Sequence, residues 1–189
     1  MNAQAEKAGK VWTEAELEAL PDDGCVHEIV SGELVMSPKN NFQHEYICER
    51  LNFALESFNR IHRLGAVFGS TIGFWMQNRN CRAPDVSFVR KERLVRLGLR
   101  PDTKTFFPGA PDLAVEVLSP GNSRAEMEGK LSDYFSSGAQ TVWLFDPDEE
   151  SVEIWHSRTD RRTIESRGII EGEPVLPGFR LPVSDLFKD

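Results

Sequence analysis

The sequence predicts a mixed α/β fold, in which a central β-sheet is flanked by helices and follows an N-terminal β-hairpin. Short apolar, β-branched runs alternate along the chain with segments whose apolar residues recur at helical spacing. Near the N-terminus, Ser31-Gly32 joins two strand-like runs and suits a two-residue hairpin turn. The length of 189 residues favours one domain, which we expect to span 11–189 after a flexible tail at 1–10.

The first half of the chain is expected to hold two helices, the hairpin and further strands. Thr13 and Glu16 have capping-box spacing, which predicts a short helix over 14–20 that ends before Pro21. The hairpin strands are expected at 27–30 and 33–36. Apolar residues at 47, 51, 54, 55, 58 and 61 predict an amphipathic helix over 42–61, and strand-like runs follow at 67–68 and 72–76.

The second half holds the runs that bear on chemistry. Residues 84–89 and 111–118 have the apolar, β-branched character of buried strands, and a long connection rich in Arg and Lys separates them. The turn cluster 119–123 can cap a helix over 124–137, which Gly138 would end. A strand is expected at 142–145 and a hairpin at 152–156 and 161–165. The Pro- and Gly-rich end is expected to be irregular, with a short final turn.

Charge and cysteine content exclude several classes of protein. The chain has 22 Lys and Arg against 30 Asp and Glu, a formal net charge of −8, which argues against coating DNA by bulk positive charge. Neither a bilayer-spanning segment nor a signal-peptide h-region is visible. Cys25, Cys48 and Cys81 are scattered and lack CxxC spacing. We therefore expect a cytoplasmic protein, not associated with membranes, whose thiols serve in packing.

Two carboxylates occupy positions that are costly for a charge. Glu116 interrupts the run Leu-Ala-Val-Glu-Val-Leu, and Asp85 stands at the start of the other buried run. Each has an ordinary explanation, a buried pair with Arg or Lys for Glu116 and a strand-end salt bridge for Asp85. Together on neighbouring strands they also suit Mg²⁺ or Mn²⁺, hard ions that prefer oxygen ligands. Both explanations stay open at this point.

Lys130 is a third candidate. In the helix predicted after Glu116, the apolar face is defined by Met127, Leu131 and Tyr134, and Lys130 lies about 60° from its centre. Lys130 can therefore lean over the strand end that carries Glu116, where it would orient water or offset phosphate charge. The alternative is a surface lysine whose stem covers apolar side chains.

With these residues in place, the chain resembles the Uma2-type restriction endonuclease family of the PD-(D/E)XK nuclease superfamily, from about Thr13 to about His156. The resemblance is carried by an ordered set of segments: 28–35, His44 in the following helix, 82–89, 111–120, Lys130-Leu131 with Tyr134 and Gly138, and 142–147. It implies a restriction-endonuclease-like core and metal-dependent hydrolysis of DNA phosphodiester bonds.

The resemblance also implies roles for individual residues. Asp85 and Glu116, with Val117, match the metal-binding positions, and Asp85, Glu116 and Lys130 match the catalytic ones. The common superfamily pattern has lysine two residues after the glutamate, where this chain has Leu118. Lys130 matches a version in which the next helix supplies the lysine.

Four further residues are accessory candidates. His44 and Glu45 lie where the family has a histidine-bearing helix, and Glu28 precedes that helix on a strand. A structural role for His44 and a hairpin or interface role for Glu28 are the alternatives. Asp112 begins its strand and shares a face with Glu116 at i, i+4, which makes it a candidate neighbour of the site.

One segment is locally basic. Residues 79–104 hold eight Arg and Lys against three Asp and Glu, a net charge of +5 that leaves −13 for the rest of the chain. We expect this loop to lie beside the carboxylates and to contact the phosphate backbone, as Arg82, Arg90, Lys91 and Arg93 would do. The alternative is a solvated surface loop.

The sequence thus predicts a Mg²⁺-dependent DNA endonuclease, with Mn²⁺ as a second possible ion and homodimerisation open. Two other functions remain. The chain can be a nuclease-fold DNA-binding or interaction module without catalysis, or a hydrolase of another phosphodiester such as RNA.

Overall fold

The computed structural model of the chain describes residues 10–21, 23, 25–37 and 40–187. Residues 1–9, most of the predicted tail, lie outside the described residues. Lys10 pairs with Glu16 across 3.2 Å and lies over the Trp12 ring. The assignment of 11–189 to one domain stays a prediction.

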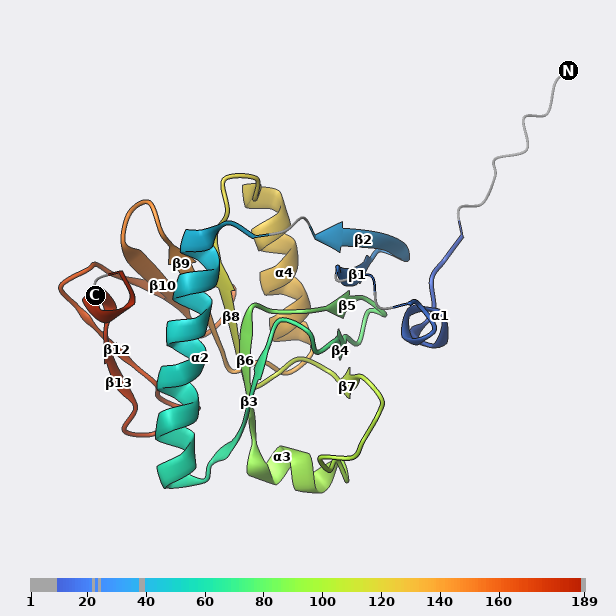
Figure 1. Cartoon of the computed structure of the whole chain (residues 1–189), viewed down its shortest axis with the longest axis horizontal. Helices are drawn as coiled ribbons and strands as arrows, with labels where there is room; N and C mark the ends of the chain where they lie inside the picture. The colour runs from blue at the N-terminus through green and yellow to red at the C-terminus, as the bar shows by residue number, and fades with distance from the viewer. Residues whose placement is uncertain (1–9, 22, 24, 38–39, 188–189) are drawn as a thin grey trace, which may run out of the picture.

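A six-stranded sheet forms the centre of the molecule, in the order β11-β10-β9-β8-β6-β3 (Figure 1). Strands β8 and β9 run parallel, whereas the other neighbours are antiparallel, so the sheet is mixed as predicted. Its strands are β3 (Gly65–Gly69), β6 (Val86–Arg90), β8 (Leu113–Val117), β9 (Thr141–Asp146), β10 (Ser151–Trp155) and β11 (Arg161–Ile164).

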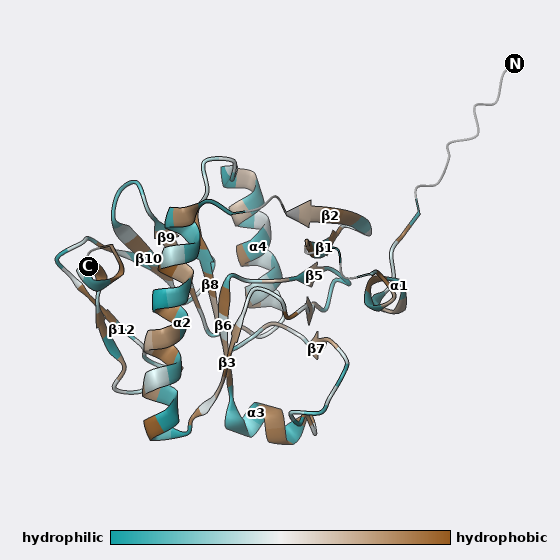
Figure 2. Cartoon of the chain, in the orientation of Figure 1, coloured by the Kyte–Doolittle hydropathy of each residue, from teal (hydrophilic) through white to brown (hydrophobic). Residues whose placement is uncertain are grey.

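Helices cover both faces of this sheet. On one face, α2 (Phe42–His62) packs Ile47, Leu51 and Leu55 against Val115 of β8. On the other, α4 (Arg124–Ser136) packs Leu131 and Tyr134 against alternate strand residues such as Ala114 and Val142. Because successive strand residues face opposite sides, β8 presents Val115 to α2 and Glu116 to the α4 side. Figure 2 shows α2 alternating between apolar and polar colours, as the predicted amphipathic pattern requires.

The predicted hairpin belongs to a second sheet. Strands β1 (Val26–Val30) and β2 (Glu33–Ser37) pair antiparallel around Ser31 and Gly32, whose φ angles of 53° and 83° give the left-handed turn that suits a hairpin. This sheet has the order β2-β1-β5-β4-β7. Its other strands are β4 (Phe74–Trp75), β5 (Cys81–Arg82) and β7 (Phe107–Pro108). The short helix α1 (Glu14–Glu18) has the predicted capping box at Thr13.

The C-terminal end is more regular than the sequence suggested. After β11, the strands β12 (Ile169–Glu171) and β13 (Arg180–Pro182) pair antiparallel, and the 3-10 helix η1 (Val183–Leu186) follows. The prediction of irregular wrapping is therefore wrong in part, although a short final turn is present. Buried side chains fix this end, because Ile170, Leu176 and Phe179 join the core beneath α2.

Two smaller expectations also need correction. The basic connection contains a helix, α3 (Lys91–Arg96), and the strand β7. Cys48 and Cys81 are buried as expected for packing residues, but Cys25 is exposed. In the part of the chain that the structure describes, no helix is long and apolar enough to cross a bilayer.

Candidate active site

The two predicted carboxylates lie on neighbouring strands at one end of the central sheet. Val86 of β6 is paired with Val115 of β8, so Asp85, immediately before β6, lies beside the Glu116–Val117 end of β8. The Val117 backbone N–H donates to Asp85 Oδ2 at 2.8 Å. The aspartate side chain thus takes the place of a backbone acceptor where the strand ladder ends, and the adjacency expected from the sequence is present.

Glu116 is held by two donors from α4. Lys130 Nζ lies 2.7 Å from Glu116 Oε2, and the Tyr134 hydroxyl donates to Glu116 Oε1. Lys130 leans over the strand end as its helical position predicted. Only 5% of Glu116 is exposed. Burial raises the pKa of Glu116 to about 7; the Lys130 charge opposes the shift, while Asp85 and Glu28 add to it.

His44 reaches the same sheet end from the first turn of α2, where Asn41 caps the helix. His44 Nε2 lies 3.3 Å from Asp85 Oδ2. Burial of the imidazole lowers its pKa, but the hydrogen bond and charge of Asp85, together with the Val117 backbone, raise it above the ordinary value. His44, one of the accessory candidates, therefore contacts both Asp85 and the Val117 backbone, the two groups that are hydrogen-bonded at this sheet end.

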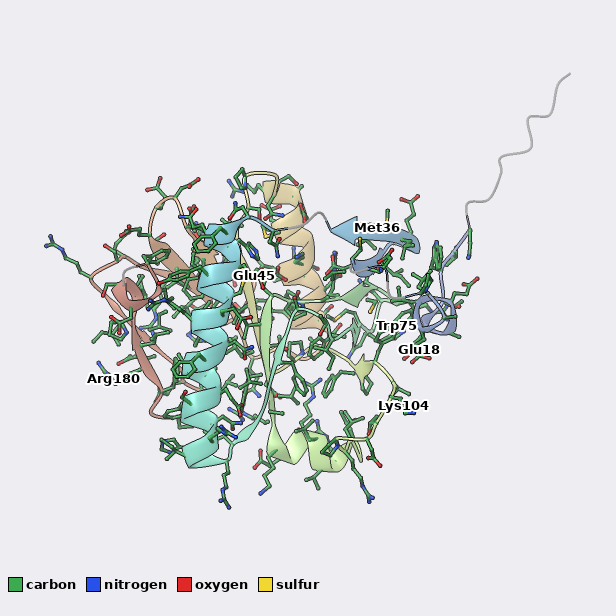
Figure 3. All side chains as sticks on the ribbon, in the orientation of Figure 1. Glu18, Met36, Glu45, Trp75, Lys104 and Arg180 are labelled. Carbon is green, nitrogen blue, oxygen red and sulfur yellow. The ribbon has the colours of Figure 1, made fainter. Side chains whose placement is uncertain are left out.

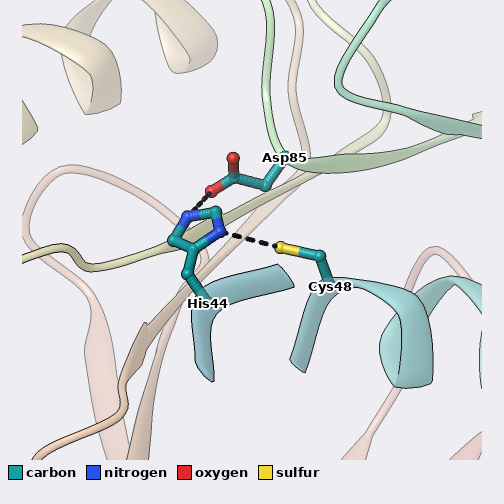
Figure 4. Close-up of side chains that lie close together, drawn as sticks. All are labelled: His44, Cys48 and Asp85. Atoms are coloured by element: carbon teal, nitrogen blue, oxygen red, sulfur yellow. Dashed lines mark hydrogen bonds and ion pairs between the residues drawn. The ribbon is translucent and has the colours of Figure 1, made fainter. Parts of the chain in front are cut away.

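Cys48 is a neighbour that the sequence analysis did not single out. Its Sγ lies 3.5 Å from His44 Nδ1, so that Cys48, His44 and Asp85 stand in a row (Figure 4). Burial, with the charge of Asp85, raises the thiol pKa far above its ordinary value, so Cys48 is not a thiolate nucleophile at neutral pH. The i, i+4 spacing of His44 and Cys48 on a predicted helix was the available signal. Donor atoms of all three residues lie within 4.8 Å of one another.

Glu28 belongs to a buried ion-pair network beside the site. Glu28 accepts from the Ala83 N–H at 2.9 Å and pairs with Arg82 across 3.3 Å. Arg82 Nε also donates to Asp133 Oδ2 at 2.6 Å. Only 4% of Arg82 is exposed, so its guanidinium is engaged inside the protein. The expectation that Arg82 contacts a phosphate backbone does not fit this burial.

Asp112 and the basic residues after β6 lie at the other end of the strands. Asp112 accepts from the Arg90 N–H at 2.9 Å, and its Oδ2 lies 3.7 Å from Arg93 Nη1. Asp112 is four residues from Glu116 along β8, a separation of roughly 13 Å. It therefore ties β6 to α3 and does not contact Glu116.

Within the basic segment, Arg90, Lys91 and Arg93 are consequently not beside the carboxylates, which corrects their expected position, whereas Arg82 pairs with Glu28 near Asp85. Figure 3 shows Lys104 well separated from Glu45 on α2. Arg93 is half-buried over the Phe107 ring, and Arg90 donates to the Pro174 carbonyl. Lys91 is exposed.

A small cleft leads from solvent to Asp85. It lies between α2 and the β3–β6 edge, and it is lined by the exposed Glu45 together with Cys48, Ser70 and Asp85. Glu45 is thus near the sheet end but is directed to the cleft. The cleft gives a water molecule or an ion access to one of the two carboxylates.

The model of the Uma2 family, described as "Putative restriction endonuclease", matches residues 14–184. The chain belongs to the Uma2 family. No curated protein matches it.

The fold of this Uma2 chain also has a solved counterpart. A crystal structure described as a putative nuclease belonging to DUF820, from Anabaena variabilis ATCC 29413, is similar with a TM-score of 0.79 and 22% sequence identity. The similarity covers 93% of this chain and 97% of that one. The predicted restriction-endonuclease-like architecture is confirmed as a nuclease fold. The family match also extends past His156 to the C-terminal strands.

The donor atoms of the Uma2 chain at this sheet end are of the kinds that divalent cations take, although the side-chain donors within 4.8 Å of one another are those of His44, Cys48 and Asp85, without Glu116. Asp85, Glu116 and the Val117 carbonyl offer oxygen atoms, which suit Mg²⁺ and Mn²⁺, and the His44 imidazole is acceptable to Mn²⁺. The negative charges of Glu28, Asp85 and Glu116 face Lys130 and Arg82, and Arg82 is shared with Asp133. Burial is the main cause of the raised pKa of Glu116, and the charges of Asp85 and Glu28 add to it against the opposing charge of Lys130.

Proposed function

We propose that this Uma2 chain is a Mg²⁺- or Mn²⁺-dependent endonuclease that hydrolyses DNA phosphodiester bonds. The single observation that carries the proposal is the joining of Asp85 to the Glu116–Val117 strand end, with Lys130 on Glu116. Asp85, Glu116 and the Val117 carbonyl would hold the cation, with His44 as an accessory ligand. A divalent ion so held lowers the pKa of bound water and offsets charge on a phosphoryl group.

Lys130 contributes positive charge rather than a basic nitrogen. Burial is the largest single influence and lowers its pKa, but the charges of Glu116, Glu28 and Asp85, with the hydrogen bond to Glu116, together raise it well above the ordinary value, so Nζ carries its proton at neutral pH. Lys130 Nζ can therefore donate to an attacking water or to a phosphate oxygen, where it offsets negative charge that develops during hydrolysis. Since Nζ is already protonated, it cannot accept the proton of that water.

Asp85 and His44 shape the other side of the site. The Val117 N–H fixes Asp85 Oδ2, and the His44 ring backs the same oxygen. Because these partners are a backbone group and a buried ring, the aspartate orientation is set before any substrate binds. Preorganisation of this kind removes the cost of ordering the ligand during the reaction.

One observation favours a second function, that of a nuclease-fold interaction module without catalysis. Glu116 and Asp85 already have partners inside the protein, Lys130 and Tyr134 for the first and His44 for the second. Satisfied buried pairs of this kind also occur for structural reasons alone. The two functions differ in one respect, since only the enzyme cleaves.

A cleavage assay separates these functions. Supercoiled plasmid DNA and a structured RNA are incubated with the protein in Mg²⁺, Mn²⁺ or EDTA. We expect DNA cleavage that requires the ion and falls at least ~100-fold in Glu116→Gln. Glu153→Gln, the same change at a partly exposed residue of β10, is the matched control. A folded protein that binds DNA but never cleaves it would establish the interaction module. Cleavage of RNA alone would show that the substrate is RNA and not the proposed DNA.

A further inference from the structure

Two side chains of α4 divide the oxygens of Glu116 between them. Lys130 and Tyr134 are four residues apart and so lie on one face of the helix. Lys130 donates to Oε2 at 2.7 Å, and the Tyr134 hydroxyl donates to Oε1. One carboxylate oxygen therefore accepts a hydrogen bond from a flexible, charged side chain, and the other accepts one from a rigid, neutral side chain.

The two donors differ in their surroundings. Tyr134 is 0% exposed and packs within the core between α4 and the sheet, with Leu131 and Val142 as neighbours. The Lys130 side chain is 12% exposed at the edge of the same layer. A phenol packed on all sides has few alternative positions, whereas a lysine has four rotatable bonds and a solvent-facing end.

The helix is also anchored at the residue before the tyrosine. Asp133 accepts from Asn78 at 2.6 Å, from Asn80 at 2.8 Å and from Arg82 at 2.6 Å. These three donors belong to the segment that leads into Asp85. The Tyr134 position is thereby fixed relative to the strand that carries the other carboxylate.

We propose that Tyr134 is a positioning residue of the cation site: it holds Glu116 Oε1, which leaves Oε2 for the cation once Lys130 Nζ moves off that oxygen. This inference rests on the proposed function. Without Tyr134, Glu116 would lose a buried donor and could rotate when Lys130 leaves. The role is exerted through Glu116, since the phenol contacts neither substrate nor ion.

Metal binding without substrate is the direct test. Mn²⁺ affinity of the full chain is measured by titration calorimetry for the wild type, Tyr134→Phe and Tyr46→Phe. The chain has two tyrosines, so Tyr46→Phe removes the only other phenol, which interacts with Arg50 on α2. We expect Tyr134→Phe to weaken Mn²⁺ binding about 10-fold, as other groups that orient metal ligands do, and Tyr46→Phe to change it less than about twofold.

Cleavage as a function of Mg²⁺ concentration supplies a second measurement. A positioning role predicts that Tyr134→Phe cleaves slowly at low Mg²⁺ and regains most of its rate at saturating Mg²⁺. Lys130→Met is expected to stay slow at every Mg²⁺ concentration. A Tyr134→Phe protein that is less stable but binds Mn²⁺ like the wild type would overturn the inference.

The outcomes separate this inference from the proposed function. If the wild type binds Mn²⁺ but does not cleave, the proposed function fails, and the affinity difference still decides the role of Tyr134. If the wild type cleaves and Tyr134→Phe binds Mn²⁺ equally well, only the role of Tyr134 fails. A wild type that binds no Mn²⁺ overturns both.

A spectroscopic measurement covers the case in which Tyr134→Phe does not fold. Wild-type protein with ¹³C-labelled tyrosine rings gives signals from Tyr134 and Tyr46, which the Tyr46→Phe variant assigns. We expect Mg²⁺ to move the Tyr134 signal and to leave that of Tyr46 in place. An unmoved Tyr134 signal at saturating Mg²⁺ would contradict the proposed role of Tyr134 in the cation site.

Discussion

The backbone N–H of Val117 donates to Asp85 Oδ2 at 2.8 Å, so the start of β6 is tied to the end of β8 at the residue after Glu116. One aspartate oxygen thereby completes the strand ladder and also faces His44. Structural and chemical roles of Asp85 are thus combined in one atom, and substitutions can separate them.

Asp85→Asn and Asp85→Ala are expected to differ in stability but not in activity. Asparagine keeps an oxygen that accepts from the Val117 N–H, so its free energy of unfolding should change by less than ~1 kcal/mol. Alanine leaves that buried N–H unpaired, which costs about 1–3 kcal/mol. Both variants should lose ion-dependent cleavage. Urea unfolding in EDTA measures the difference, and an asparagine variant as unstable as the alanine variant would refute the structural role.

Lys130→Met should destabilise the protein more at pH 8.5 than at pH 5.5. Loss of Lys130 removes the cation beside Glu116. The Glu116 carboxylate then takes up a proton more readily, because a buried carboxylate without a cationic partner favours its neutral form. At pH 5.5 Glu116 is neutral, so most of the cost of burying an unpaired charge is avoided. At pH 8.5 Glu116 is charged, and the free energy of unfolding is expected to fall by about 3 kcal/mol or more. Urea unfolding at the two pH values provides the check, and the double variant with Glu116→Gln should recover stability at pH 8.5.

The metal-free wild type should become less stable as pH rises from about 5 to 8. The pKa of Glu116 is about 7 in the folded state against an ordinary value of 4.5, so the folded protein binds more protons than the unfolded chain between these values. The raised pKa of His44 acts in the same direction, since the stability that protonated His44 contributes is lost as the pH rises through its folded-state pKa. One pKa unit corresponds to ~1.4 kcal/mol, so a loss of a few kcal/mol at most is expected.

Melting temperatures in EDTA across this pH range test the prediction. Glu116→Gln carries no titrating group at this position and should show a flatter profile. Addition of Mn²⁺ at pH 8 should restore stability to the wild type, because a ligand that binds only the folded state stabilises it. A wild-type profile that rises with pH would show that Glu116 is ionised well below pH 7.

Arg82→Met should destabilise the protein by about 3–5 kcal/mol, because it leaves the buried carboxylates of Glu28 and Asp133 without their shared cation. The matched control is Arg124→Met, which breaks an exposed i, i+4 pair with Glu128 and should cost less than ~0.5 kcal/mol. Denaturant unfolding distinguishes them. Equal losses in the two variants would mean that the Arg82 network contributes nothing beyond a surface pair.

Lys91→Ala is expected to weaken DNA binding without changing the cleavage rate at saturating DNA. Lys91 is exposed and lies at the end of β6 remote from Asp85, so it can contact a phosphate but not the reacting one. Loss of one phosphate contact should lower the slope of log K against log salt by about 1. Arg158→Ala, another exposed cation, is the control. An unchanged salt dependence would show that the basic segment is a solvated loop.

The site carboxylates could be found in the sequence because each violates a local rule. Glu116 lies within an apolar run, and Asp85 stands at the head of another, so both had to be explained by partners or by an ion. Lys130 could be placed because helix geometry is periodic. The resemblance to the Uma2-type family implied the roles of these residues.

Other parts could not be predicted because they depend on contacts between distant segments. Arg82, Arg90 and Arg93 belong to a basic segment, yet Arg82 and Arg93 are turned inward by acidic residues 51 and 19 positions away. Pairing of β12 with β13 was hidden because Pro and Gly interrupt the strand pattern there. Cys48 was overlooked because its relation to Asp85 exists only when α2 lies across the sheet end.

The sequence by itself determined the alternation of helices and strands, the hairpin at Ser31-Gly32 and the presence of two misplaced carboxylates, since periodicity and turn chemistry are local properties. Only the tertiary structure decided where the acidic and basic side chains lie relative to one another. It put Glu28, Asp85 and Glu116 at one sheet end and Arg90, Lys91 and Arg93 at the other, because antiparallel pairing of β6 with β8 brings Asp85 to Val117 and Arg90 to Asp112.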